Sequence, residues 1–118
     1  MLRRIFVLNK KKRMRNINSN KEFNELVKSG KPMMLDFYAD WCGPCQSLLP
    51  TVEKLAEEFK GEVEIVKINV DEQKDIAAKF QVRSIPSLFF MQGNKVKDSV
   101  RGGASEASLR KKIKALMN

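Results

Sequence analysis

The sequence predicts an α/β domain with a central mixed β-sheet flanked by helices on both faces. Apolar runs typical of buried strands alternate with segments whose apolar residues recur at helical spacing, which favours parallel strands joined by right-handed crossovers. Two later strand-like runs flank Gly93-Asn94, and a hairpin at this turn would add antiparallel strands to the sheet. At 118 residues the chain has room for one such domain around one hydrophobic core.

The net charge of +9 is concentrated at the N-terminus. Residues 1–21 carry eight Lys or Arg and no acid, whereas residues 22–118 carry 15 bases and 14 acids. We therefore expect residues 1–15 to be a basic, disordered extension and residues 16–118 to be the folded domain. Weak attraction of the extension to nucleic acid or anionic lipid is the less favoured interpretation, and we expect no specific nucleic-acid binding.

The extension does not fit a secretory signal, because its apolar run is only four residues long and a basic cluster follows it. No apolar stretch approaches the length of a membrane span. A cytoplasmic protein is the expectation. Met14 is a candidate translation start, and deletion of residues 1–13 should leave fold and activity intact.

The first predicted helix covers residues 20–29. Ser19 and Glu22 have the spacing of a capping box, and Gly30 can end the helix in a left-handed conformation. A buried strand is predicted over residues 33–39, and Asp36 is the exception in this apolar run.

Residues 44–59 form the next predicted helix, because apolar residues lie along one side and charged residues along the other. Pro50 should kink this helix and Gly61 should end it. The β-branched run 63–70 predicts a strand, and Asp71 is expected to cap a short helix that contains Ile76, Ala77 and Phe80.

The C-terminal third predicts a hairpin followed by a helix. Its strands cover residues 87–91 and 95–100, with Pro86 just before the first. Ser105 can cap a last helix whose apolar face contains Leu109, Ile113 and Leu116.

Cys42 and Cys45 carry the candidate chemistry. The chain has no other cysteine and no histidine, so it cannot fill a four-ligand zinc site alone or use histidine-dependent catalysis. Cys42 falls between a buried strand and a helix N-terminus, where unpaired N–H groups favour a thiolate. Cys45, one turn later, can resolve a mixed disulfide. A static disulfide and half of a metal site remain as alternatives, but the position in a strand–helix–strand unit favours redox chemistry.

Asp36 is the second candidate, since a carboxylate in an apolar strand should have a raised pKa. Lys67 interrupts the neighbouring apolar strand, and a cross-strand pair would partly neutralise both charges. Asp36 is either a proton acceptor that helps to deprotonate Cys45 or an edge-of-core carboxylate satisfied by water.

The run Asp36–Cys45, DFYADWCGPC, is followed by Pro50, Lys67–Asp71, Ile85-Pro86-Ser87, Gly93 and Gly102. In this order, over about residues 16–118, the chain resembles the thioredoxin family. The resemblance implies a thioredoxin fold and a protein-disulfide reductase. It also implies that Cys42 is the exposed nucleophile, Cys45 the buried resolving thiol, Asp36 the acid/base residue and Lys67 its partner. The implied substrate-binding residues are Trp41, Gly43, Pro44, Ile85, the cis-proline Pro86 and Gly102.

By the same resemblance, the chain binds no cofactor and no metal. Its Cys42–Cys45 disulfide is re-reduced from NADPH by thioredoxin reductase, its substrates are disulfide-containing proteins, and the chain is a monomer. Four positions depart from the commonest family pattern: Tyr38, Gln46, Ser84 and Ser87. A thiol oxidase or isomerase and a non-catalytic binding module are the competing hypotheses.

Overall fold

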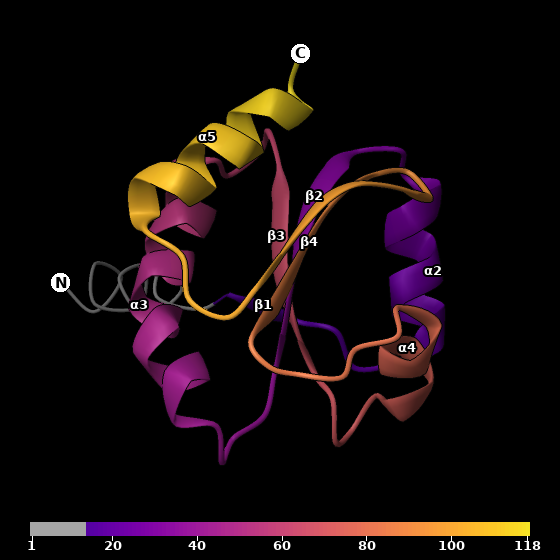
Figure 1. The fold of residues 1–118 in the computed structure, drawn as a ribbon. Helices are drawn as coiled ribbons and strands as arrows, with labels where there is room; N and C mark the ends of the chain where they lie inside the picture. The colour runs from indigo at the N-terminus through magenta and orange to yellow at the C-terminus, as the bar shows by residue number, and fades with distance from the viewer. Residues whose placement is uncertain (1–13) are drawn as a thin grey trace, which may run out of the picture.

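The computed structural model describes residues 14–118 and confirms the predicted mixed sheet between helices, which has five strands (Figure 1). The strands lie in the order β1-β3-β2-β4-β5. In chain order, the elements are β1 (Arg15–Asn16), α2 (Asn20–Lys28), β2 (Pro32–Tyr38), α3 (Gly43–Glu58), β3 (Glu64–Asn69), α4 (Lys74–Lys79), β4 (Ser87–Gln92), β5 (Lys95–Arg101) and α5 (Glu106–Leu116).

The two-residue strand β1 was not predicted. It pairs in parallel with β3, and Met14 just before it is only 8% exposed. Residues 14 and 15, which the prediction places in the extension, therefore pack as part of the described fold. The predictions about a disordered extension and about deleting residues 1–13 lie outside the described residues.

Strand β2 is the centre of the sheet, with β3 parallel on one side and β4 antiparallel on the other. Asp36 is in register with Lys67 on β3 and with Leu88 on β4. The predicted hairpin is present as β4 and β5, with a register shift between Phe90 and Met91.

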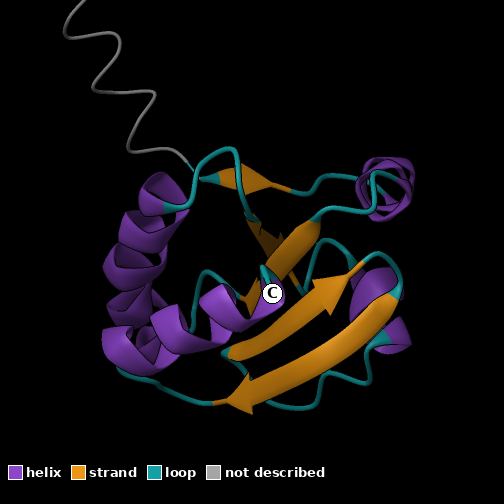
Figure 2. Ribbon diagram, turned by 90° about the horizontal axis from the view of Figure 1, so that it is seen from above, coloured by secondary structure: helices purple, strands orange, loops and turns teal. Residues whose placement is uncertain are grey.

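Helices cover both faces of the sheet, α3 and α5 on one side and α2 and α4 on the other (Figures 1 and 2). Two hydrophobic cores result. The core under α3 and α5 contains Met34, Val52, Leu55, Leu88, Phe90, Leu109 and Ile113. The core under α2 and α4 contains Phe23, Leu26, Met33, Leu35, Phe37, Val66, Ile68 and Ile76.

Most predicted helix ends are confirmed. The Ser19 side chain accepts a hydrogen bond from the Glu22 N–H and the Ser105 side chain accepts one from the Ser108 N–H. Gly30, just after α2, has a φ of 73°, which a residue with a Cβ rarely adopts. The Glu22 carboxylate accepts from the Asn18 N–H rather than from that of Ser19, so the capping box is displaced by one residue.

The predicted cap at Asp71 is wrong. Helix α4 starts at Lys74, and its N-cap residue Gln73 makes no side-chain capping bond. The Asn69 amide oxygen instead accepts hydrogen bonds from the backbone N–H groups of Asp71 and Glu72. This turn separates β3 from α4 and leaves the Asp71 carboxylate free for another partner.

Candidate active site

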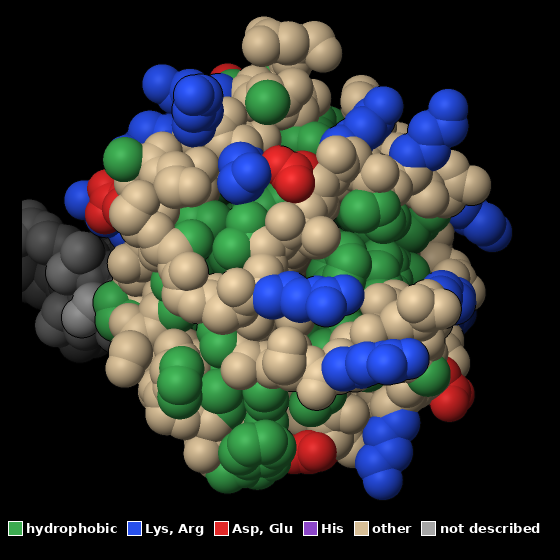
Figure 3. All heavy atoms as spheres, in the orientation of Figure 1, with side chains coloured by type: hydrophobic (Ala, Val, Ile, Leu, Met, Phe, Trp, Pro, Cys, Tyr) green, Lys and Arg blue, Asp and Glu red, His purple; other side chains and the backbone are tan. Residues whose placement is uncertain are grey.

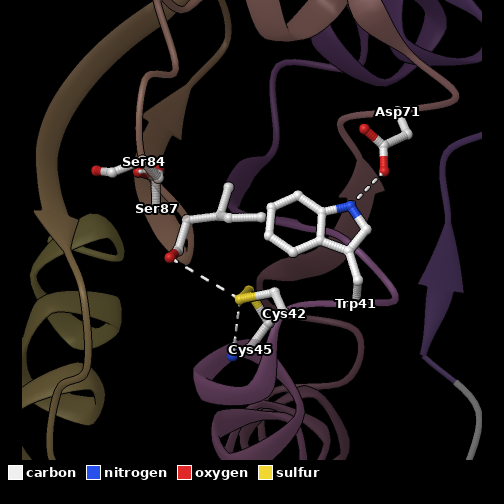
Figure 4. Close-up of a disulfide and its surroundings, with 7 residues drawn as sticks. Trp41, Cys42, Cys45, Asp71, Ser84 and Ser87 are labelled. Atoms are coloured by element: carbon white, nitrogen blue, oxygen red, sulfur yellow. Dashed lines mark hydrogen bonds between the residues drawn. A yellow bond between two sulfur atoms is a disulfide. The ribbon is translucent and has the colours of Figure 1, made fainter.

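Cys42 and Cys45 form a disulfide at the N-terminus of α3 (Figure 4). Cys42 is the N-cap residue, and its Sγ accepts a hydrogen bond from the Cys45 N–H at 3.2 Å. Pro44 occupies the first turn, where its missing N–H leaves no intrahelical bond unmade. A Cys42 thiolate formed on reduction would occupy a helix N-terminus, where the backbone N–H groups and the helix dipole stabilise negative charge.

Both cysteines are buried in this oxidised state, Cys42 at 4% and Cys45 at 3% exposure. The expectation of an exposed Cys42 is therefore wrong for the disulfide. Cys42 is bonded to Cys45 and packs in a small cluster with Tyr38 and Ala39, against which Ile85 also packs. The sulfur is covered by these neighbours.

The loop that contains Pro86 lies against the disulfide. The Ile85–Pro86 peptide bond is cis, as the resemblance implies, and the Ile85 carbonyl oxygen is 3.9 Å from Cys42 Sγ. The Gly102 N–H donates to the Pro86 carbonyl oxygen at 2.8 Å, and Gly102 has a φ of 81°. The Ser87 hydroxyl donates to the Ser84 carbonyl oxygen at 2.6 Å. The Ser87 bond closes the loop on itself, and the Gly102 bond connects the loop to the residue that follows β5.

Trp41 is the most exposed large hydrophobic side chain among the described residues, at 73%. Its indole Nε1 donates to the Asp71 carboxylate at 2.8 Å (Figure 4). Hydrophobic side chains gather at the lower end of the face in Figure 3, where the loop from β2 to α3 lies in Figure 1. Sequence reasoning missed the bond to Asp71, because the two residues are 30 positions apart.

Asp36 is only 2% exposed, and its Oδ1 has no hydrogen-bond partner. Burial raises the pKa of Asp36 to about 7, while the positive charge of Lys67 acts in the opposite direction. The raised pKa predicted from the sequence is thus confirmed. The carboxylate and the ammonium lie on neighbouring strands in register, but none of the ion pairs within residues 14–118 joins them.

Two further residues, Tyr38 and Asn16, lie near Lys67 and were not predicted to do so. The Lys67 Nζ lies over the Tyr38 ring, 5.3 Å from its centroid. The Asn16 side-chain N–H donates to the Tyr38 hydroxyl at 3.0 Å. The only sequence signal was the departure of Tyr38 from the common family residue, and Asn16 gave none because β1 was not predicted.

Within residues 14–118, no group of three or more His, Cys, Asp or Glu side chains could hold a metal ion. The helices of this part are also too short or too polar to cross a bilayer.

Comparisons with known proteins identify the family to which this fold and cysteine pair correspond. The family model Thioredoxin matches residues 15–115. Thioredoxin 1 of Chlorobaculum tepidum is 42% identical over 91 residues, which cover 76% of this chain and 90% of that protein. The chloroplastic thioredoxin M-type of Pisum sativum is 38% identical over 96 residues, or 80% of this chain and 56% of that protein.

Solved structures agree. A mutant thioredoxin from Halobacterium salinarum has a TM-score of 0.81 and 32% identity, covering 91% of this chain and 93% of that one. Oxidised mitochondrial thioredoxin 3 from Saccharomyces cerevisiae has a TM-score of 0.78 and 33% identity, covering 87% of this chain and 95% of that one.

Proposed function

The chain belongs to the thioredoxin family, and from this membership we propose how its residues divide the work of disulfide reduction. It is a protein-disulfide oxidoreductase that acts by dithiol–disulfide exchange through its cysteine pair. The observation that carries the proposal is the disulfide itself, held at the N-terminus of α3 next to the Ile85 carbonyl.

In the first step, the Cys42 thiolate attacks one sulfur of a substrate disulfide. A Cys42–substrate bond forms, the substrate S–S bond breaks, and the other substrate sulfur leaves as a thiolate. The position of Cys42 supports its assignment as nucleophile, since the helix N-terminus lowers the pKa of a thiol placed there.

In the second step, Cys45 resolves the mixed disulfide. The Cys45 thiol transfers its proton to the Asp36 carboxylate, and the resulting thiolate attacks Cys42 Sγ. The substrate's second sulfur leaves as a thiolate, so the substrate has gained two electrons and the Cys42–Cys45 disulfide has formed. A pKa of about 7 supports Asp36 as the acceptor, because a base is most effective when its pKa is near the working pH. Lys67 acts as the charge partner of Asp36.

We assign substrate docking to the surface around the disulfide. Trp41 supplies an exposed aromatic side chain beside Cys42, and the Ile85 backbone lies next to the sulfur that the substrate must approach. The full set is Trp41, Gly43, Pro44, Ile85, Pro86 and Gly102.

Re-reduction by an NADPH-dependent thioredoxin reductase, a monomeric state and a cytoplasmic location complete the proposal. Relatives with chloroplastic and mitochondrial names make the compartment a question for cell fractionation. Light scattering tests the monomer. The proposed boundary between a basic N-terminal extension and the catalytic domain is tested by removing residues 1–13, which stops just before the buried Met14.

Dithiothreitol-driven reduction of insulin disulfides tests the function directly. The wild-type chain should accelerate the reaction, Cys42→Ser should abolish the acceleration, and Cys45→Ser should accumulate a mixed disulfide visible by mass spectrometry. A wild-type chain that leaves the rate unchanged would contradict general reductase activity. If cells carrying the Cys42→Ser, Cys45→Ser double variant kept the wild-type phenotype, the chain would act as a non-catalytic binding module rather than as an enzyme.

A further inference from the structure

Tyr38 connects the disulfide to the buried charges. It is the last residue of β2, is 9% exposed, and packs in the same cluster as Cys42 and Cys45. Its ring faces the Lys67 ammonium, and its hydroxyl accepts a hydrogen bond from Asn16. One side chain therefore contacts the redox centre, a cation and the Asn16 amide.

These groups form a row across three strands. Asn16 on β1 is in register with Lys67 on β3, which is in register with Asp36 on β2. Asn16 Oδ1 and Asp36 Oδ1, at the two ends of the row, are buried and have no hydrogen-bond partner. Lys67 lies between these two residues in the strand register, and neither oxygen accepts a hydrogen bond from it.

A lysine in this position needs another restraint. Its long flexible stem lets the ammonium move toward water, and the half-buried Lys67 has no ion-pair partner among the described residues. The face of an aromatic ring attracts a cation and supplies such a restraint. The positive charge of Lys67 lowers the pKa of Asp36, and this effect weakens as the two groups move apart. A contact that holds the ammonium in place therefore also keeps its effect on the Asp36 pKa constant.

We propose that Tyr38 is a positioning residue for the resolving step: its ring holds the Lys67 ammonium beside Asp36, and the hydrogen bond from Asn16 holds the ring. The proposal deepens the proposed function and rests on the role given there to Asp36. It adds two residues, Tyr38 and Asn16, that act on the proton acceptor through Lys67 and do not react themselves.

The ionisable groups facing Asp36 are few within residues 14–118. Lys67 is in register with it on β3, and the Tyr38 phenol lies on β2 itself. In the proposed resolving step, the reduced Cys45 thiol on α3 is the third such group. The β4 neighbour in register is Leu88, and the β1 residue in the row is the uncharged Asn16. In the oxidised chain the cysteines do not titrate, and the sequence contains no histidine.

The direct test is carboxyl ¹³C NMR titration of Asp36 in the oxidised protein. Tyr38→Leu removes the ring and should raise the Asp36 pKa by about one unit, which is a tenfold loss of ionised carboxylate below the midpoint. Tyr38→Phe keeps the ring but loses the hydrogen bond from Asn16, so its shift should be smaller than that of Tyr38→Leu and similar to that of Asn16→Ala. Asn16→Ala should give an intermediate shift and provides a milder variant if Tyr38→Leu fails to fold.

A double-mutant cycle isolates the route. Lys67→Met should raise the Asp36 pKa at least as far as Tyr38→Leu does, and adding Tyr38→Leu to Lys67→Met should cause no further shift. An unchanged Asp36 midpoint in Asn16→Ala and in every folded ring-removing variant would overturn the proposal. An equal shift with and without Lys67 would also overturn it, because Tyr38 would then act without the lysine.

The reactive consequence is measured separately. The rate of resolution of a preformed Cys42 mixed disulfide should have a pH midpoint that moves upward in Tyr38→Leu and moves less in Tyr38→Phe, which keeps the ring. If Asp36→Asn resolves at the wild-type rate, the proposed role of Asp36 fails. The NMR titration still decides whether Tyr38 positions Lys67, so the two failures are distinguishable.

Discussion

The two faces of the sheet are built from the same strands but differ in polarity. In β2, Met33, Leu35 and Phe37 enter the core under α2 and α4, while Met34, Asp36 and Tyr38 alternate with them toward α3. The first face is apolar, and the second combines an apolar core with a buried carboxylate, an ammonium and the cysteines. Alternation therefore lets one strand supply stability on one side and chemistry on the other.

The apolar face is expected to show the largest stability effect. Phe37 packs its ring against Phe80 and Phe89, with centroid distances of 5.4 and 5.5 Å. Phe37→Ala should lower the free energy of unfolding by about 3–5 kcal/mol, because it removes a fully buried aromatic ring and leaves a cavity. Urea unfolding at pH 7 measures the change. Phe37→Leu is the milder comparison, and a loss below about 1 kcal/mol for the alanine variant would break the contrast.

On the face that contains Asp36, a substitution is expected to raise the free energy of unfolding rather than lower it. In the folded chain its pKa is about 7, well above the value of about 4 for an unfolded aspartate. Below pH 4 the carboxyl is protonated in both the folded and the unfolded chain, so its burial costs no ionisation energy. As the pH rises from about 4 to about 7, the unfolded chain ionises first and the free energy of unfolding falls progressively. Asp36→Asn should therefore raise the free energy of unfolding by about 2–4 kcal/mol at pH 8 and change it little at pH 4.

Denaturant titrations of the wild type and Asp36→Asn at both pH values check this dependence. The same variant should resolve the mixed disulfide more slowly, which would separate the stability of this face from its activity. An equal stability change at pH 4 and pH 8 would contradict a titrating Asp36 as the cause.

The smallest expected stability losses come from removing helix N-caps, and these losses should be the same on the two faces of the sheet. Ser19 caps α2 over the apolar face and Ser105 caps α5 over the other, each with one side-chain hydrogen bond. Ser19→Ala and Ser105→Ala should each cost about 1 kcal/mol, since a helix N-cap is a local interaction. Thermal unfolding of both variants provides the comparison. A difference of more than about 1 kcal/mol between them would show that cap strength depends on the face.

Local interactions explain what the sequence predicts well. Ser19, Ser105 and Gly30 act on backbone groups a few residues away, so their roles follow from spacing alone. Asp36 and Lys67 were also found from the sequence, because each places a charge in an otherwise apolar strand and the two strands are neighbours in the sheet.

Contacts between distant segments explain what it misses. Strand β1 has two residues and no periodicity, and it exists because β3 offers it a pairing edge. Without β1, nothing places Asn16 near Tyr38, 22 positions away. Asp71 is a residue type that often caps helices. Here, however, the Asn69 side chain accepts from the nearby backbone N–H groups, and the Asp71 carboxylate accepts from the Trp41 indole.

The small separation of the cysteines has a consequence for the whole scaffold. They are three positions apart, so the cross-link encloses a single turn. In the chain-entropy account a ring this small restricts the unfolded ensemble by only about 2 kcal/mol, against about 4.7 for a ring of 100 residues. Cohesion therefore comes from the packed layers on either side of the strands. The bond can be made and broken in every catalytic cycle while the architecture around it persists.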